Sequence, residues 1–342
     1  MDSLTQIVLG AAVGEAVAGK KIGNKAMLWG AIAGTIPDLD ILANFWLDMV
    51  GQISFHRSVT HSFLFAFILS PILGYVLWRI YKKEQATYWQ WTLLFFLGFT
   101  THAILDSFTT WGTQLFWPFS RTGVAFYNVF VIDLFYTVPF LIFLIATAFY
   151  NRKSKSRAIL NYAGLAISSA YIVFSFYAKS LANKAFEASL KEQGINYTSY
   201  ISKPTPLNTV LWAVTAKTDK GYYTGFYSLL DNDLNIKFEF EPKQWELLQP
   251  YRGNKKLERL LQITRDYYTV YKGEGDELLI NDLRFGQFDG WRKGGGHYVF
   301  VYKLKPDGKN LYFEEKNYRP KPDAAYFKSF INRIRGKKEG EL

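Results

Sequence analysis

The sequence predicts a membrane α-helical bundle of about six transmembrane helices, followed by a soluble α+β domain built mainly from antiparallel sheet. Most of the long apolar stretches of the 342-residue chain lie in residues 1–180, which contain only eight acidic residues. Later runs are short and alternate apolar with polar residues, as in strands with one buried face. We therefore divide the chain into a transmembrane domain (1–180), a helical extension and linker (181–206) and a soluble domain (207–342).

Six segments of the first half have the length of a membrane-crossing helix, which needs about 17 to 25 mostly apolar residues. The predicted spans are 3–19, 26–45, 62–80, 89–108, 129–150 and 158–178. The second span is the most irregular, because Pro37 interrupts a helical hydrogen-bond ladder and two aspartates follow at once. We expect this span to break or end near a membrane face.

Basic residues orient the predicted bundle, since cytoplasmic loops are enriched in Lys and Arg. Ten of the thirteen basic residues in the first half lie in the loops after spans one, three and five. This pattern predicts a multi-pass protein with both termini and the soluble domain outside the cytoplasm. The net charge of +11 comes without nucleic-acid-binding motifs, so the bilayer is the expected partner and nucleic acid is not.

The second half is predicted to continue the last helix to residue 193 and then to form a linker over 194–206. Strands are expected at 209–215, 222–229, 236–240, 267–271, 278–280, 297–304 and 311–315, and helices at 244–248, 255–264 and 324–335. No P-loop, nucleophile elbow or metal motif occurs in this half, and His297 is interpreted as a solvated strand residue. We interpret this half as a cap or interaction module.

Nearly all ionisable residues expected inside the apolar half fall in four short stretches: 37–40, 56–62, 102–106 and 132–133. On the predicted topology all four stretches reach the same membrane face. Carboxylates and imidazoles at membrane depth cost free energy, so each is a candidate functional group. Their common depth predicts one polar site.

These residue types are typical of a metal site. The chain has no cysteine, so a metal must be held by His, Asp or Glu. The candidate ligands are Asp38, Asp40, His56, His61, His102 and Asp106. They suit a divalent metal, with zinc favoured over manganese or iron. Because a catalytic zinc site uses about three protein ligands, some of these residues should support the ligands or act as a base, unless two metals bind.

Spacing adds detail to this hypothesis. His102 and Asp106 are four residues apart and share one helix face. Asp38 and Asp40 diverge on a regular helix but can converge in an extended or turn segment. His56 is expected in a loop, and His61 at the start of the next helix.

Several alternatives stay open. Arg57 is either a counter-ion for Asp38 or Asp40 or a binding group for an anionic substrate. Asp133 has a structural or a functional role, and Glu15 is interpreted as a snorkelling or helix-packing group. The same residue types also occur in proton- or cation-coupled transporters and channels. A membrane-anchored interaction scaffold is the third function class.

The motifs resemble the YdjM-type bacterial inner-membrane proteins, a LexA-regulated family of metal-dependent hydrolases. The resemblance covers about residues 1–150 and rests on the order of its motifs. They are Met1 to Thr5, the Gly-rich first span, Pro37 to Asp40, His56-Arg57 with Thr60-His61-Ser62, His102 to Asp106, Thr109 to Gly112, Trp117 to Ser120 and Ile132-Asp133. It implies a hydrolase of the bacterial cytoplasmic membrane whose His and Asp residues bind metal. Family members commonly carry His at the position of Gln6, where this chain departs from the pattern.

The leading hypothesis is therefore a membrane-bound metal-dependent hydrolase acting at the outer face of the cytoplasmic membrane. Its substrate is expected to be a lipid or a lipid-linked ester or phosphoester. Catalytic roles are assigned to Asp38, Asp40, Arg57, His61 and Asp106, with the metal activating water. The sequence does not indicate an oligomeric state.

Overall fold

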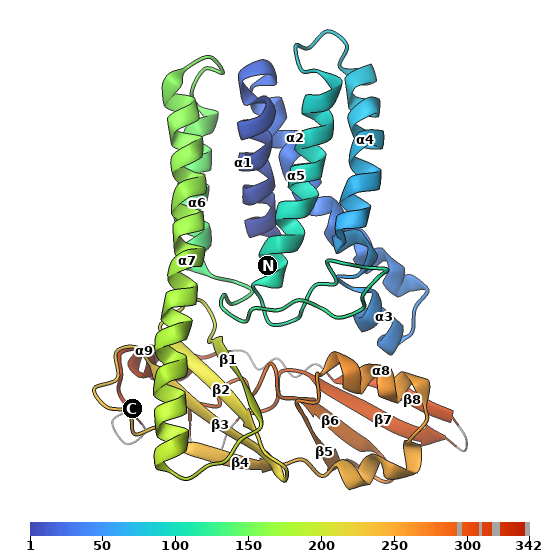
Figure 1. Cartoon of the computed structure of the whole chain (residues 1–342), viewed down its shortest axis with the longest axis vertical. Helices are drawn as coiled ribbons and strands as arrows, with labels where there is room; N and C mark the ends of the chain where they lie inside the picture. Colours follow the sequence, from blue (N-terminus) through green and yellow to red (C-terminus); the bar gives the residue numbers. More distant parts are fainter. Residues whose placement is uncertain (293–295, 308–309, 317–321, 339–342) are drawn as a thin grey trace. The chain divides into compact units, whose positions relative to one another are not determined.

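The computed structural model describes residues 1–292, 296–307, 310–316 and 322–338 (Figure 1). The chain divides into two compact units. The first unit comprises Met1–Trp46, Phe55–Phe176 and Pro206–Asn208, and the second comprises Leu47–Ser54, Tyr177–Thr205 and Thr209–Leu342. The first unit contains helices and loops, and the second contains two sheets.

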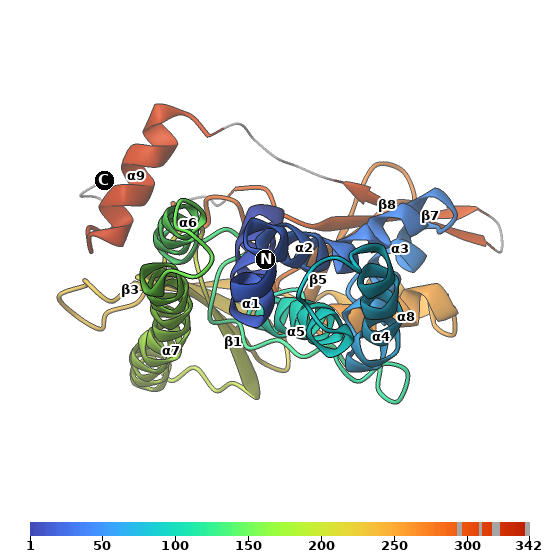
Figure 2. The ribbon, with the colours of Figure 1, turned by 90° about the horizontal axis from the view of Figure 1, so that it is seen from above.

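The first unit is a bundle of helices that run side by side (Figures 1 and 2). Its elements are α1 (Ser3–Ile22), α2 (Asn24–Thr35), the 3-10 helices η1 (Ile36–Phe45) and η2 (Val59–His61), α4 (Phe63–Ile80), α5 (Tyr88–Ser107), α6 (Leu134–Ala148) and the first part of α7 (Lys155–Glu192). The short helix α3 (Met49–Phe55) follows η1, and most of it belongs to the second unit. Apolar side chains of α1, α5 and α6 form one core cluster, and those of α2, α4 and α5 dominate another.

Side-chain caps and a proline set the element boundaries near the polar stretches. Asp2, Ser62 and Asp133 cap α1, α4 and α6 by accepting hydrogen bonds from backbone N–H groups of the first turn. The α-helical conformation of α2 ends at Thr35, and the chain continues as η1 with Pro37 in its first turn. The predicted break in the second span is therefore confirmed.

Glycines allow α1 and α2 to approach each other closely. A Cβ atom at Gly10 would lie 2.3 Å from the carbonyl oxygen of Gly30, and one at Gly34 would lie 2.4 Å from that of Gln6. These distances are far below van der Waals contact, so a side chain at either position would push the helices apart. The close packing brings Gln6 and Gly34 to the polar end of the bundle.

Three described helical segments are long and apolar enough to cross a membrane: Asn24–Phe45, Phe63–Ile80 and Lys155–Glu192. The apolar helix α6 has only 15 residues, which is below the usual lower limit of about 17. Buried polar side chains reduce the apolar character of α1 and α5, as Glu15 and Asp106 illustrate. Six spans and the orientation of the termini stay predictions.

The second unit contains two four-stranded antiparallel sheets, with strand orders β1-β2-β3-β4 and β5-β6-β7-β8. The strands are β1 (Ser199–Pro204), β2 (Leu211–Lys217), β3 (Gly221–Ser228), β4 (Phe238–Pro242), β5 (Tyr268–Lys272), β6 (Leu278–Asp282), β7 (Val301–Asp307) and β8 (Asn310–Lys316). Besides most of α3 and the end of α7, this unit contains the helices η3 (Trp245–Tyr251), α8 (Lys255–Ile263) and α9 (Ala324–Ile334). The predicted antiparallel architecture is confirmed.

Two apolar clusters hold helices against the first sheet. Phe186 of α7 packs with Trp212 and Val214 of β2. Trp291 and Phe330, the latter from α9, pack in a second cluster that includes Leu211 of β2. The predicted helical continuation beyond span six is thus confirmed, because α7 runs to Glu192 and its end is part of this core.

The linker predicted over 194–206 is wrong in part, because it contains strand β1. In this strand Ser202 pairs with Val214 and Ile201 with Thr215 of β2. The segment Ser199–Pro204 has no apolar run of its own. Its strand conformation depends on pairing with β2, which a local pattern does not reveal.

Candidate metal centre

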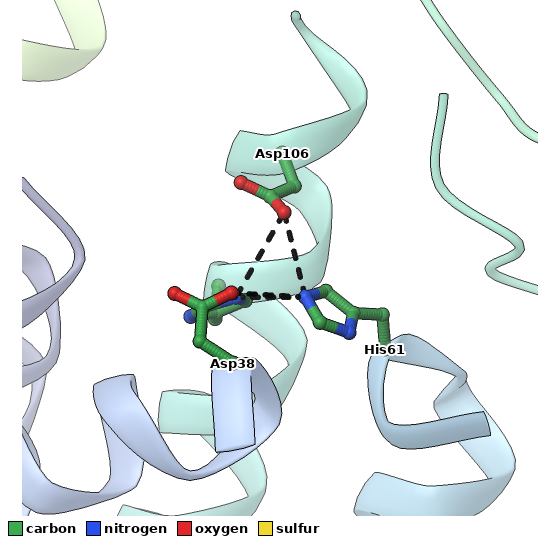
Figure 3. A group of neighbouring side chains, drawn as sticks. Asp38, His61 and Asp106 are labelled. Atoms are coloured by element: carbon green, nitrogen blue, oxygen red, sulfur yellow. Dashed lines mark hydrogen bonds and ion pairs between the residues drawn. The ribbon is translucent and has the colours of Figure 1, made fainter. Parts of the chain in front are cut away.

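Four side chains converge at one end of the helical unit: Asp38, His61, His102 and Asp106. Asp38 lies on η1, His61 ends η2, and the other two residues lie one turn apart on α5. Figure 3 shows Asp38, His61 and Asp106 directed toward one another. One potential ligand atom of each of the four residues lies within 4.8 Å of the others.

The spacing of the donor atoms suits a single ion. Nε2 of His61 lies 3.1 Å from Nε2 of His102, and Oδ1 of Asp38 lies 3.5 Å from each nitrogen. Oδ2 of Asp106 lies 3.5 Å from Nε2 of His61 and 3.9 Å from that of His102. Around a tetrahedral metal with bonds of about 2.0 to 2.1 Å, ligand atoms lie about 3.3 Å apart. The four donors therefore fit one divalent metal with small adjustments.

A backbone carbonyl sets the tautomer of His102. Its Nδ1 lies 2.7 Å from the carbonyl oxygen of Gly34. A carbonyl oxygen only accepts, so Nδ1 carries the proton and donates it. In the neutral ring, Nε2 then presents a lone pair to the centre, as in metal-bound histidines whose second nitrogen is held by a hydrogen bond.

His61 has a comparable arrangement. Its Nδ1 lies 3.0 Å from Oγ1 of Thr60 and 3.6 Å from Oδ2 of Asp40. The Thr60 hydroxyl donates to the same Asp40 oxygen at 3.4 Å, so its oxygen accepts from Nδ1 of His61. Nε2 of His61 therefore also presents a lone pair.

Two imidazole lone pairs and two carboxylates thus face one point. These groups repel one another unless positive charge lies between them. A shared proton would satisfy only two of the four donors, whereas a divalent cation accepts from all of them. The chemistry of the donor set therefore fits a metal.

Asp106 is held by several further groups. Its Oδ1 accepts a hydrogen bond from Nε2 of Gln6 at 2.9 Å and contacts the Met1 amino group. Nε of Arg57 lies 2.9 Å from its Oδ2. Of the two roles left open for Arg57, that of a counter-ion for Asp38 or Asp40 does not agree with these contacts. The guanidinium pairs with Asp106, and only the backbone N–H of Arg57 bonds to Asp40, at 2.9 Å.

The backbone explains this change of partner. Arg57 has a φ of 59°, a left-handed conformation that few non-glycine residues adopt. Its side chain is buried, and its guanidinium also donates to Oγ1 of Thr109 at 2.8 Å. In this conformation the backbone N–H of Arg57 is directed to Asp40, and the side chain is directed to Asp106. The sequence did not reveal this left-handed turn.

Asp40 and His56 were predicted as ligands, but they lie beside the four-residue group and not in it. Nδ1 of His56 lies 3.0 Å from Oδ1 of Asp40. The carboxylate of Asp40 is buried, whereas the His56 side chain is 38% exposed. Asp40 therefore connects an accessible imidazole with the imidazole of His61.

The remaining polar candidates have structural partners. Asp133 caps α6 and accepts hydrogen bonds from the hydroxyl of Tyr171 at 2.8 and 2.9 Å. Glu15 forms a buried bidentate ion pair with Arg157, at 2.7 Å for both contacts. The interpretation of Glu15 as a helix-packing group agrees with this contact.

Sequence reasoning missed three contributors to the centre. Thr60 stands next to His61 in a polar motif, but it was not among the candidate site residues. Gly34 contributes a backbone carbonyl, which leaves no signal in residue type. Gln6 holds Asp106 and also donates to the carbonyl oxygen of His102 at 3.3 Å. The available signal was its position, where family members commonly carry His.

The sequence of this chain is similar to those of known proteins, and one match covers the helical unit. Over 133 residues, or 36% of this chain, the sequence is 32% identical to the Uncharacterized protein YfhP of Bacillus subtilis (strain 168), and the match spans 39% of that protein. Over 119 residues, or 34% of this chain, it is 27% identical to the Inner membrane protein YbcI of Escherichia coli (strain K12), of which 67% is covered. No solved structure matches the chain.

The model of the YdjM inner membrane protein family matches residues 1–182, which include the four converging residues. This match covers more than half of the chain and confirms the resemblance, so the chain belongs to the YdjM inner membrane protein family.

Proposed function

We propose that the protein is a metal-dependent hydrolase of the cytoplasmic membrane, acting at its outer face on a lipid or lipid-linked ester or phosphoester. The observation that carries the proposal is the convergence of two imidazole nitrogens and two carboxylates at one end of the helical unit. Hydrogen bonds hold both imidazoles in the tautomer that ligates metal. Membership of a family of inner membrane proteins supports the location.

Asp38, His61, His102 and Asp106 would hold the divalent metal. When bound, with a water as a further ligand beside these four side chains, it would lower the pKa of that water toward about 7 and polarise the substrate's carbonyl or phosphoryl oxygen. Zinc suits this donor set, and manganese or iron can replace it. The side chain of Asp38 is 27% exposed and the other three are exposed by 1% or less, so substrate approaches from the side of Asp38.

His56 is the proposed proton carrier. Asp40 accepts the hydrogen bond from its Nδ1, which orients the ring and leaves Nε2 for exchange with a substrate. The exposure of His56 and the burial of Asp40 suit these two roles. Arg57 neutralises Asp106 in this proposal and so limits the negative charge of the ligand set.

The basic loops support a position of the centre on the outer side of the membrane, because cytoplasmic loops are enriched in Lys and Arg. Arg152 and Arg157 lie at the opposite end of the helical unit from the centre, together with Lys20 and Lys21 at the end of α1. Both termini and the second unit would then be extracytoplasmic. If the centre lies at the outer face, the ester or phosphoester linkage of the substrate must lie there too.

Metal analysis of the detergent-purified chain tests the proposal. We expect about one divalent metal per chain, and we expect His61→Ala and His102→Ala each to lose it because two imidazoles supply half of the ligand set. His297→Ala in the second unit is the matched control and should keep the metal. Metal-free protein, or metal content unchanged in both ligand variants, would overturn the metal centre.

Hydrolysis must be tested separately from metal binding. The loaded protein should release product from an ester or phosphoester lipid, and His61→Ala should abolish this release. A loaded protein that instead moves protons or cations across liposomes, and hydrolyses no lipid ester or phosphoester, would favour the transport alternative. Metal content thus tests the metal site, and product release tests the hydrolase activity.

A further inference from the structure

The 3-10 helix η1 has one exposed apolar side. Side chains three residues apart align in a 3-10 helix, so η1 presents three rows. Pro37 and Asp40 belong to a buried row. Leu39, Leu42 and Phe45 form the opposite row, and their exposed fractions are 51%, 51% and 80%.

The third row connects the metal centre with this apolar side. It begins at Asp38, the most exposed of the four converging residues, and continues to Ile41, which is 62% exposed. Asp38 therefore lies where the buried polar centre meets an apolar surface. The row ends at Asn44, which is exposed, so the apolar path to Asp38 runs over Ile41 and the neighbouring Leu42.

Contact of the exposed apolar side chains of η1 with water costs free energy. Trp46, which follows η1 directly, is 82% exposed and its ring contacts that of Phe45. Soluble proteins rarely expose so many large apolar side chains together. Because η1 continues α2 within Asn24–Phe45, a segment long and apolar enough to cross a membrane, acyl chains of the bilayer are the matching cover.

We infer that a bilayer lipid reaches the metal centre sideways along η1, with its acyl chains against Leu39, Leu42 and Phe45 and its ester or phosphoester linkage beside Asp38. The inference rests on the proposed function and narrows its substrate to a lipid that stays in the membrane during hydrolysis. Water-soluble esters would lack the contacts that place the linkage at Asp38.

Spin labels can test the surface without any turnover. The natural chain has no cysteine, so Leu42→Cys and Phe45→Cys each allow a single nitroxide label in vesicles of phosphatidylethanolamine and phosphatidylglycerol. Ile72→Cys on the exposed side of α4 is the lipid control, and Asp219→Cys in a turn of the second unit is the water control. We expect both η1 labels to collide more with oxygen than with a water-soluble nickel chelate, as the Ile72→Cys label does.

Two outcomes of that measurement would overturn the inference. Labels on η1 that collide mainly with the nickel chelate, as at Asp219→Cys, would show that water covers the surface. Labels reached by neither reagent would show that a protein surface, such as a second copy of the chain, covers it. Both outcomes leave the metal analysis unaffected.

Turnover then tests the path itself. Leu42→Gln should lower kcat/KM for phosphatidylglycerol in vesicles by about tenfold, because one large apolar contact is lost. Its metal content should match that of wild type, and Ile72→Gln, on the exposed side of α4, should keep the wild-type kcat/KM on the same vesicles. An equal loss in Ile72→Gln, or no loss in Leu42→Gln, would overturn the inference. Failure of the wild-type, metal-loaded protein to hydrolyse any ester or phosphoester would refute the proposed function, while the spin labels still report the surface.

Discussion

Each aspartate near the centre has a different set of partners, and these partners determine its role. Asp38 faces both histidines and is partly exposed. Asp106 faces the same histidines but is also paired with Arg57 and Gln6. Asp40 is not one of the four converging residues, and its carboxylate contacts Nδ1 of His61 and Nδ1 of His56. In the proposed metal centre, these three identical side chains are thus an open ligand, a neutralised ligand and a supporting group.

The supporting role of Asp40 predicts a change in metal affinity. Asp40→Asn should weaken metal binding by about 10- to 100-fold, because groups that orient a metal-bound imidazole typically contribute that much. His56→Ala should keep wild-type affinity and slow turnover, since His56 lies outside the ligand group. Titration against a competing chelator measures both affinities. Unchanged affinity in Asp40→Asn, or a loss in His56→Ala equal to that in His61→Ala, would contradict these assignments.

A buried lysine in the second unit makes stability depend on pH. Lys203 of β1 is 9% exposed, and its Nζ lies 5.7 Å from the centre of the Phe285 ring. Burial lowers the pKa of Lys203 from 10.5 to about 7. Between these values the unfolded chain binds a proton that the folded chain lacks, so stability should rise with pH from about 7 to 10 and fall as pH drops toward 7.

Comparison of wild type with Lys203→Met tests this dependence. The variant should melt at a higher temperature than wild type near pH 7, and the difference should shrink as pH approaches 10. Thermal melting of the second unit across this range measures it. A difference that is constant or grows with pH would show that Lys203 is not the group responsible.

At the residue scale, part of the site could be predicted and part could not. The spacing of His102 and Asp106 on one helix face predicted their approach, which the structure shows. The choice between Asp38 and Asp40 depended on the 3-10 conformation of η1, which places them in different rows. Gly34 contributes only its backbone carbonyl to the site. Every residue has such a carbonyl, so the residue type could not predict this contact.

At the scale of elements, a buried ion pair connects the first helix with the last helix of the bundle. Glu15 of α1 and Arg157 of α7 are separated by 142 residues and form two hydrogen bonds of 2.7 Å. Both side chains are nearly inaccessible, at 5% and 3% exposed. Removal of one partner would leave the other charge buried without compensation.

This pair predicts a loss of stability without a loss of metal. Glu15→Gln should destabilise the fold by about 3 to 5 kcal/mol, the usual effect of leaving one buried charge unpaired. The double variant Glu15→Leu with Arg157→Leu should recover most of that loss. Thermal melting reports stability, and metal content should stay at the wild-type level in all variants that fold. Metal loss in Glu15→Gln at a temperature where it remains folded would assign Glu15 to the centre.

Elements with a strong local pattern could be predicted, and those made by pairing could not. The long apolar helices and the alternating strands of the second unit follow from periodicity. Strand β1 was missed because its six residues acquire strand structure from the ladder with β2. The 3-10 conformation of η1 was also missed, since a proline near a helix end indicates a break but does not specify the conformation of the next residues.

At the scale of the whole molecule, all four converging residues belong to the first unit. Helices of alternating direction bring segments that are distant in sequence to the same end of that unit, as α2, α4 and α5 do here (Figure 1). The distribution of basic residues predicts this meeting, because loops on one side of a membrane share one depth. Asp133 shares that end but serves α6 as a cap.

X-ray absorption at the metal edge of the purified, metal-loaded chain tests the central claim most directly. We predict one metal with nitrogen and oxygen ligands at about 2.0 to 2.1 Å if the metal is zinc, with scattering from two imidazole rings. His102→Ala should remove one ring or the metal itself. A spectrum with no imidazole scattering, or one that His102→Ala leaves unchanged, would contradict the claim that Asp38, His61, His102 and Asp106 form a metal centre.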